Sequence, residues 1–298
     1  MDKQDIFVGV DLGGTKIRSV ALDRWRNVVS EDERKSGIGA QDVTQNLLDS
    51  IGTVLSQLPE DEYELSHIGI GTPGTVDPVA KIVRHSLNLG ISELDLGEAV
   101  QSRFNCELNL ENDVNATALG LSTIYQELTS LAYLNFGTGL AAGFVINGKI
   151  WSGASGLAGE IGHIPIGSEE ASCQCGQVGC LEVLTTWTGL GLKYPNLKDF
   201  SEVLKSGDKI AEATQAFAIF RLNAVRALLT LFLSIDPEQI FVGGGMMQNN
   251  KSVFEQVLAD FGKFVESSPL LSGKNLEKRV QMIPDNSPVA CIGAVGEI

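Results

Sequence analysis

Short apolar runs alternate with amphipathic stretches along the first part of this chain of 298 residues. Residues 6–10 form an apolar, β-branched run, and after a Gly-Gly-Thr turn residues 17–22 predict the second strand of a hairpin. Residues 67–70 resume as a buried strand. Between them, residues 41–58 place apolar side chains on one helical face, namely Val43, Leu47, Leu48, Ile51, Val54 and Leu55. This alternation predicts an α/β fold.

The same pattern returns in the second half of the chain. Residues 132–146 predict a strand, a Gly-Thr-Gly turn and a strand, with Thr138 in the place that Thr15 has in the first copy. Asn147-Gly148 then predicts a hairpin turn into residues 149–151. The repetition predicts a duplicated domain with a cleft between the halves.

The remainder of the second half continues the α/β pattern. We expect a long helix from about Lys209 to Ser234, a strand over residues 239–242 and another helix from about Asn249 to Ser267. No low-complexity segment or charge run separates the two halves of the sequence. The connection is therefore expected to be a packed hinge rather than a flexible tether.

Composition and charge narrow the class of protein. With 43% hydrophobic and 20% charged residues the chain has the balance of a soluble globular protein. Its 22 Lys and Arg against 37 Asp and Glu give a net charge of −15, which repels phosphate backbones and anionic lipids. The longest apolar stretch, residues 227–235, has about half the length of a bilayer span, and the N-terminus lacks a signal-peptide pattern. We expect a cytoplasmic protein that binds neither nucleic acid nor membrane.

Residues 11–16, Asp-Leu-Gly-Gly-Thr-Lys, follow the first predicted strand. Gly13 and Gly14 let backbone N–H groups approach an anion. Thr15 offers a hydroxyl and Lys16 a positive charge, while Asp11 is suited to hold Mg²⁺ through water. The segment is a candidate phosphate loop. The alternative is a glycine-rich hairpin in which Asp11 bonds its own turn.

Two more glycine clusters follow predicted strands. Gly137-Thr138-Gly139 is the counterpart of the first loop, with less charge. Gly243-Gly244-Gly245 lies between a strand and a helix, where a nucleotide can rest on backbone amides and a helix N-terminus. The spacing is not GxGxxG, so no dinucleotide-binding fold is predicted. The alternative for the third cluster is a tight strand-to-helix turn.

Glu111-Asn112-Asp113 precedes a helical pattern over residues 114–121. Asp113 is a candidate general base that faces a hydroxyl and is oriented by Asn112 and Asn115. The alternative is a purely structural N-cap, because Asp is a preferred residue at that position.

The most specific signal is a cluster of one histidine and three cysteines. One imidazole and three thiolates at the spacing His-x9-Cys-x-Cys-x4-Cys predict a tetrahedral Zn²⁺ site with the ligands His163, Cys173, Cys175 and Cys180. Four protein ligands leave no position for a reacting water, so the zinc is expected to be structural. The other two cysteines, Cys106 and Cys291, predict buried thiols.

Polar side chains flank the cysteine loop. Glu160, His163 and Glu182 are suited to bind several hydroxyls of a sugar through charge-assisted hydrogen bonds. Residues 86–89, Ser-Leu-Asn-Leu, form a second polar loop that can close over the same ligand. Each of these residues taken alone is more typical of a surface loop than of a binding site.

Together these segments resemble the ROK family of bacterial sugar kinases and sugar-responsive repressors. The resemblance covers nearly the whole chain and rests on DLGGTK (11–16), GTPGTVD (71–77), SLNL (86–89), END (111–113), FGTGLAAG (136–143), SGASGLAGEIGH (152–163), CQCGQVGCLE (173–182) and VGGG (242–245). The chain departs from the family at Ala141 and Ala142, where glycine is usual, and this leaves the nucleotide preference open.

The resemblance implies an actin-like ATPase fold of two ribonuclease-H-like lobes with ATP, Mg²⁺ and a hexose in the cleft. We expect the lobes at residues 1–115, completed by about 284–298, and at 116–283. By matching positions Asp113 is the catalytic base. The implied sugar-binding residues are Asn88, Asn112, Glu160, His163 and Glu182, and the implied zinc ligands are His163, Cys173, Cys175 and Cys180. Gly13, Thr15, Thr138 and Gly244 match the phosphate and nucleotide loops, beside the candidates Asp11, Gly14, Lys16, Gly137 and Gly243.

The expected reaction is ATP-dependent phosphorylation of a hexose. Glucose is the first choice because Glu160, His163 and Glu182 suit a pyranose with several equatorial hydroxyls. N-acetylmannosamine, N-acetylglucosamine, mannose, allose and fructose are alternative substrates, and polyphosphate is an alternative donor. The family precedent is a homodimer or a dimer of dimers.

A second class of function stays open, that of a regulator. Repressors of the family carry a helix-turn-helix domain ahead of the first glycine loop. Only ten residues precede Asp11 in this sequence, so direct DNA binding is not expected. A non-catalytic, sugar-responsive binding protein is the remaining alternative.

Overall fold

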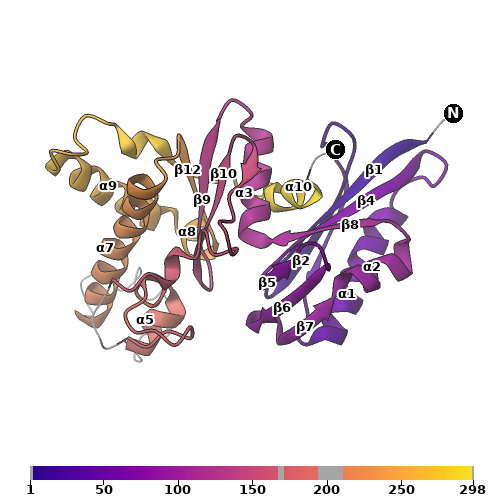
Figure 1. Ribbon diagram of the computed structural model, residues 1–298, viewed down its shortest axis with the longest axis horizontal. Helices are drawn as coiled ribbons and strands as arrows, with labels where there is room; N and C mark the ends of the chain where they lie inside the picture. Colours follow the sequence, from indigo (N-terminus) through magenta and orange to yellow (C-terminus); the bar gives the residue numbers. More distant parts are fainter. Residues whose placement is uncertain (1–2, 167–170, 194–210, 297–298) are drawn as a thin grey trace. The chain divides into compact units, whose positions relative to one another are not determined.

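The computed structural model describes residues 3–166, 171–193 and 211–296, which divide into two compact units (Figure 1). Unit 1 comprises Met1–Glu127, Gly148–Ile150 and Asn286–Ile298. Unit 2 comprises Leu128–Asn147 and Trp151–Asp285. The boundary expected after residue 115 falls inside helix α3 (Asp113–Ile124), and this whole helix belongs to unit 1.

Unit 1 is built on a mixed sheet in the order β3-β2-β1-β4-β8. Its strands are β1 (Gln4–Leu12), β2 (Lys16–Leu22), β3 (Val28–Lys35), β4 (Tyr63–Thr72) and β8 (Glu107–Asn112). β1 and β2 form the predicted antiparallel hairpin, whereas β1, β4 and β8 run parallel. A smaller antiparallel sheet joins β5 (Thr75–Asp77), β6 (Ile82–Ser86) and β7 (Ile91–Asp95).

Helices cover both faces of the larger sheet in unit 1. The strand alternation directs Val8 and Val10 into one apolar cluster with Leu47 and Ile51 of α1 (Ala40–Ser56), next to α2 (Leu96–Phe104). On the opposite face Phe7 joins a cluster with α10 (Val289–Val295). The amphipathic helix predicted at residues 41–58 is confirmed as α1, because its apolar stripe is the buried face.

α10 lies unusually close to α3 within unit 1. A Cβ at Gly120 of α3 would lie 1.9 Å from the carbonyl oxygen of Val289, and one at Gly293 would lie 1.8 Å from that of Ala116. Any side chain at these two positions would separate the helices. The C-terminal segment is therefore an integral part of the unit that carries the N-terminal strands.

Unit 2 repeats the strand order of unit 1. β10 (Leu140–Ile146), β9 (Ser130–Phe136), β12 (Gln239–Gly243) and β13 (Val280–Met282) follow the order and directions of β2, β1, β4 and β8. The predicted duplication is thereby confirmed at the level of topology. Asn147 and Gly148 both have positive φ, at 51° and 74°, as a tight hairpin turn before β11 (Lys149–Ile150) requires.

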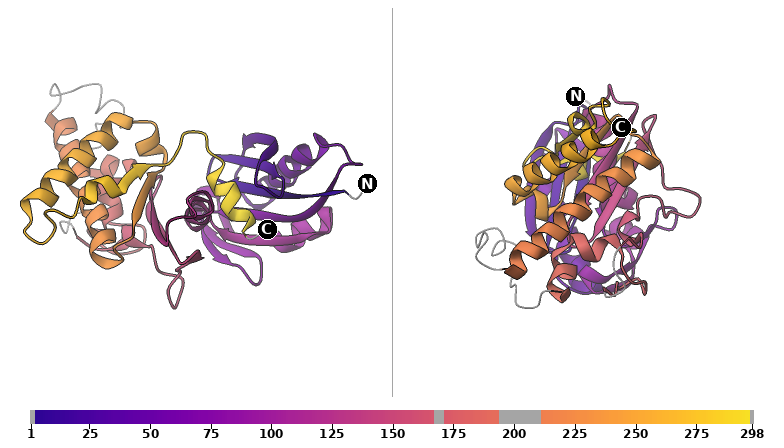
Figure 2. Two further views of the ribbon diagram at one scale, coloured as in Figure 1. Left: turned by 90° about the horizontal axis from the view of Figure 1, so that it is seen from above. Right: turned by 90° about the vertical axis from the view of Figure 1, so that its left-hand side faces the viewer.

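Two long helices, α7 (Ala211–Ser234) and α9 (Lys251–Ser267), lie side by side in unit 2 (Figure 2). Their packing includes Phe232 stacked on Phe261, with ring centroids 5.7 Å apart. The short helices are α4 (Leu181–Thr185), α5 (Trp187–Lys193) and α8 (Gly245–Gln248). The helix expected from Asn249 is confirmed as α9, whereas the expected start of α7 at Lys209 lies outside the described residues.

Within the described residues one helix, α7, has the length and composition to cross a membrane, over Thr214–Ser234. More than half of its most apolar window, 56%, is buried inside the protein. Phe220, Ala224 and Leu228 belong to the apolar core of unit 2. Burial in this core accounts for the apolar composition of α7 without a bilayer.

Candidate functional site

Asp11 and Asp113 are brought together in unit 1. Asp11 lies near the carboxyl end of β1, and Asp113 begins α3 directly after β8, which runs parallel to β1 with β4 between them. Burial raises the pKa of Asp11 to about 7, with the charge of Asp113 acting in the same direction and that of Arg18 against it. Two carboxyl groups about a hundred positions apart in sequence therefore interact at one edge of the sheet.

The residue that caps α3 is Asn112, so the alternative of Asp113 as N-cap is wrong. Oδ1 of Asn112 accepts hydrogen bonds from the backbone N–H groups of Val114 at 2.9 Å and Asn115 at 3.3 Å. Asn is as good an N-cap as Asp, and the cap falls one residue earlier than expected. Asp113 occupies the first helical position, where its Oδ1 also accepts from Val114 at 3.0 Å.

Glu111 is a site residue to which the sequence pattern assigned no role. Its Oε1 accepts hydrogen bonds from the backbone N–H of Asn112 at 2.8 Å and from Nδ2 of Asn115 at 3.1 Å. Asn112 and Asn115 are the two neighbours expected to orient Asp113. Glu111 thus fixes the start of α3 from the strand side. The sequence signal that could have indicated this role is the position of Glu111 as a third polar residue directly before Asn112 and Asp113.

The turn between β1 and β2 is held by backbone and side-chain bonds. The N–H of Gly13 donates to the carbonyl of Lys16 at 2.8 Å, and the Ser36 hydroxyl donates to the carbonyl of Gly13 at 2.6 Å. The Lys16 ammonium pairs with Glu33 at 2.6 Å on the exposed surface. Thr15 is exposed. The hairpin is confirmed, and Lys16 is paired with a carboxylate in this structure.

Asn88 contacts this turn. It lies in a short 3-10 helix (Leu87–Leu89) after β6, with its side chain exposed. A Cβ at Gly14 would lie 3.0 Å from the Cβ of Asn88. The candidate phosphate loop and a candidate sugar-binding residue are therefore neighbours, and Gly14 leaves the space in which Asn88 sits.

The second and third glycine clusters also meet, in unit 2. β9 and β12 are parallel and pair Asn135 with Gly243, so both strands end at the same edge of the sheet. Gly244 has a φ of 86°, and a Cβ there would lie 2.3 Å from the carbonyl carbon of Phe136. Only glycine fits this position on both counts. Thr138 is exposed in the turn beside it.

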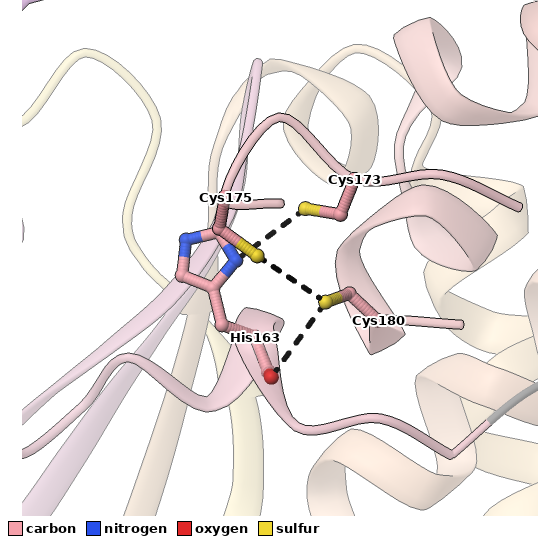
Figure 3. A group of neighbouring side chains, drawn as sticks. All are labelled: His163, Cys173, Cys175 and Cys180. Atoms are coloured by element: carbon pink, nitrogen blue, oxygen red, sulfur yellow. Dashed lines mark hydrogen bonds between the residues drawn. The ribbon is translucent and has the colours of Figure 1, made fainter. Parts of the chain in front are cut away.

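The four predicted metal ligands form one cluster in unit 2. One ligand atom from each of His163, Cys173, Cys175 and Cys180 lies within 4.8 Å of the others. Nδ1 of His163 is 3.6 Å from Sγ of Cys173, and Sγ of Cys175 is 3.6 Å from Sγ of Cys180 (Figure 3). A tetrahedron with Zn–S bonds of about 2.3 Å has edges of about 3.8 Å, close to these separations. The donor set and spacing fit a metal ion.

The cysteine loop has the tight geometry that such a cluster needs. The N–H of Cys173 donates to the carbonyl of Gln177 at 2.8 Å, and that of Gly176 donates to the carbonyl of Cys173 at 3.0 Å. Gly176 has a φ of 90° and Gly179 a φ of 75°. The glycines in the motif thus supply left-handed backbone that lets the loop turn its sulfurs inward.

The three thiols differ in acidity. The backbone N–H of Gln177 lowers the pKa of Cys175 to about 6. Burial raises the pKa of Cys180 to about 12, and burial also raises that of Cys173. Since a metal binds thiolates, occupation of this cluster is linked to proton release from the two buried thiols.

Three of the predicted sugar-binding residues, Glu160, His163 and Glu182, belong to the metal cluster or lie next to its ligands. Nε2 of His163 faces away from Cys173, toward Oε2 of Glu160 at 3.8 Å. Glu182 lies in the first turn of α4, two residues after Cys180, and its Oε2 accepts a hydrogen bond from the backbone N–H of Leu140 at 3.0 Å. The cysteine loop therefore contacts the imidazole of His163 and leads directly into Glu182, while Glu160 lies beside that imidazole.

Comparison with known proteins identifies the family. The sequence profile of the ROK family matches residues 7–286. The chain belongs to the ROK family. Relatives of the chain include an enzyme and a repressor. A glucokinase of Halalkalibacterium halodurans is 29% identical over 280 residues, 86% of this chain and 84% of that protein. A xylose repressor of Bacillus subtilis is 24% identical over 305 residues, 98% of this chain and 77% of the repressor.

A solved structure extends the comparison to the fold. The ROK family glucokinase from Streptomyces griseus in complex with glucose and AMPPNP superposes with a TM-score of 0.75 at 24% identity, over 97% of this chain and 98% of that one. The predicted actin-like ATPase fold of ROK sugar kinases is confirmed.

Proposed function

We propose that this ROK protein transfers the terminal phosphoryl group of ATP to a hydroxyl of a hexose, with Asp113 as the general base. The observation that carries the proposal is the Asp11 and Asp113 pair beside the β1–β2 glycine turn. One carboxylate is suited to accept a proton and the other to hold a cation. A phosphoryl transfer to an alcohol needs both.

Asp113 is suited to the role of base by its place in the helix. A sugar hydroxyl has a pKa far above neutrality, so its proton must leave as the bond to phosphorus forms. A positioned carboxylate that accepts this proton contributes about 10²–10⁴-fold to the rate. The N-terminus of α3 favours negative charge at Asp113. Hydrogen bonds from backbone N–H groups to the side chains of Asn112 and Glu111 support this terminus.

ATP is assigned to the glycine turns. When bound with ATP, Mg²⁺ neutralises the charge of the transferring group. Asp11 is the residue we assign to hold the ion through water. The turns that contain Gly13, Gly14, Gly137, Thr138, Gly243 and Gly244, with the hydroxyls of Thr15 and Thr138, are assigned to the phosphate oxygens. Lys16 is assigned to the negative charge of the phosphates.

The hexose is assigned to the polar residues of the family motifs. Asn88, Asn112, Glu160, His163 and Glu182 are the proposed ligands of its hydroxyls. Glucose is the first choice, supported by the glucokinase relative and by the carboxylate of Glu160 beside the imidazole of His163. N-acetylmannosamine, N-acetylglucosamine, mannose, allose and fructose stay alternative substrates.

The metal cluster is proposed to bind one structural Zn²⁺. Its four protein ligands complete a tetrahedron, so no reacting water is assigned to it. Zn²⁺ would stiffen the loop that bears His163 and leads into Glu182. The ion would therefore act on sugar affinity indirectly, through the loop, and on the stability of the protein directly.

A regulator without catalytic activity is the second candidate, supported by the relationship to xylose repressors. The proposal further places the protein in the cytoplasm as a homodimer or homotetramer. The deciding experiment is a panel of the named hexoses with ATP or polyphosphate, read by formation of the sugar phosphate. Turnover of one hexose with ATP supports the kinase. Sugar binding without any product in the whole panel supports the regulator.

A further inference from the structure

Asn135 lies between the two glycine turns of unit 2. It is the penultimate residue of β9, and its register partner on β12 is Gly243. A Cβ at Gly244 would lie 2.5 Å from Oδ1 of Asn135, and a Cβ at Gly137 would lie 3.2 Å from its Nδ2. The half-buried amide thus contacts both turns at the edge of the sheet where the strands end.

Tyr133 sets the orientation of this amide. Tyr133 and Asn135 are two residues apart on β9, so their side chains point to the same face of the sheet. The buried Tyr133 hydroxyl donates to Oδ1 of Asn135 at 3.2 Å. A Cβ at Gly243 would lie 2.7 Å from that hydroxyl, so the glycine also makes room for the phenol. With Oδ1 engaged, Nδ2 is directed toward Gly137.

Nδ2 of Asn135 is an oriented donor that no described residue accepts. The two turns that Asn135 contacts, at Gly137 and Gly244, are the ones assigned above to the phosphates of ATP, and their glycines let an anion approach the backbone closely. An additional neutral N–H₂ at this place adds a hydrogen bond to a phosphate oxygen without adding charge.

We infer that Asn135 is a binding residue for the phosphate chain of the nucleoside triphosphate and that Tyr133 is its positioning residue. This inference rests on the proposed kinase function and names a donor-side contact that the glycine motifs do not include. It assigns Asn135 to the phosphoryl donor and not to the sugar. Changes at this residue should consequently alter ATP affinity and leave hexose affinity unaltered.

Asn135→Asp is the most selective test. The aspartate keeps an acceptor for Tyr133 and nearly the same shape, but it removes the N–H₂ donor and places a negative charge beside the phosphates. We expect the KM for ATP to rise at least tenfold, the KM for hexose to change less than twofold and the melting temperature to stay within about 2 °C. The matched control is Asn147→Asp. Asn147 is exposed in the turn after the C-terminal end of β10, away from the glycine turns, and the change should leave both KM values unaltered.

Tyr133→Phe provides an independent variant that deletes only the hydroxyl. It should raise the KM for ATP two- to fivefold because the amide loses its preferred orientation. Unchanged ATP affinity in Asn135→Asp, or an equal rise of both KM values in the two variants, would overturn the assignment of Asn135. If the wild-type protein neither binds ATP nor phosphorylates any hexose, the proposed function itself is wrong, and the assignment falls with it.

Discussion

The carboxylate of Glu182 accepts a hydrogen bond from the backbone N–H of Leu140 at 3.0 Å. Glu182 follows the last cysteine of the metal cluster by two residues, and Leu140 begins the strand after the Gly-Thr-Gly turn. A single side chain therefore connects the cysteine loop to the candidate nucleotide turn. Leu140 is almost completely buried, so its N–H depends on this partner.

Glu182→Ala should destabilise the protein through Leu140. Removing the acceptor leaves a buried N–H without a partner, which costs about 1–3 kcal/mol. Glu182→Gln keeps an acceptor oxygen and should lose less than half of that, while it raises the KM for hexose if Glu182 also binds sugar. Urea denaturation of both variants, with the exposed Glu266→Ala on α9 as control, measures the difference. Equal stability of the alanine variant and the wild type would contradict this role.

The metal cluster predicts one Zn²⁺ per chain by elemental analysis. Cys175→Ser should lose the ion and lower the melting temperature by at least about 5 °C, since several kcal/mol of metal binding stabilise the folded chain. Cys106→Ser, outside the cluster, should retain both the ion and the melting temperature. Full stability of Cys175→Ser after exhaustive chelation would show that the cluster is not a structural metal site.

Gly14→Ala should affect sugar binding more than stability. The added methyl would lie 3.0 Å from the Cβ of Asn88, an atom next to the backbone that moves only with its loop. We expect the KM for hexose to rise several-fold with a small change in free energy of unfolding. Gly191→Ala on α5, where an added Cβ meets nothing within 4 Å, is the matched control. A Gly14→Ala variant with wild-type KM would mean that Asn88 does not contact the sugar.

Asp11 predicts a specific pH dependence of stability in the absence of Mg²⁺. Its pKa rises from 3.8 to about 7 on folding, so between these values the folded chain holds a proton that the unfolded chain has lost. This contribution to stability is present at low pH and is lost as the pH rises through 7. Asp11→Asn removes it, and the variant should gain at least about 2 kcal/mol relative to wild type as the pH rises from 4 to 7.5. Denaturation in EDTA at several pH values measures the gain. A difference in free energy of unfolding between variant and wild type that does not change with pH would contradict the prediction.

The sequence predicted the repeated core because its signals are local. Residues 6–10 and 132–136 are short, largely apolar runs that are followed by glycine turns, and such runs are typical of buried strands. The sequence alone could not exclude Asp113 as the cap of α3, because Asn112 and Asp113 are equally suited to that position. Local preference cannot distinguish two residues that both cap helices well. The end of β8 at Asn112 determines where α3 begins.

Other parts of the site depend on contacts between distant segments. The interaction of Asp11 with Asp113 requires β1 and β8 to end at the same edge of one sheet. Asn135 gave no signal of its own, because its importance comes from Gly244, more than a hundred residues later. The cysteine cluster was predictable in full, since its ligand types and spacing already describe a tetrahedral site.

The central claim is that Asp113 takes the proton of a hexose hydroxyl, and Asp113→Asn tests it most directly. Asparagine keeps an acceptor for the N–H of Val114 and the shape of the side chain, but it cannot take up the proton. With the hexose that the wild-type protein phosphorylates, we predict that kcat falls by about 10²–10⁴-fold while the KM for ATP and the melting temperature stay near wild type. A variant that phosphorylates the hexose at the wild-type rate would contradict the account.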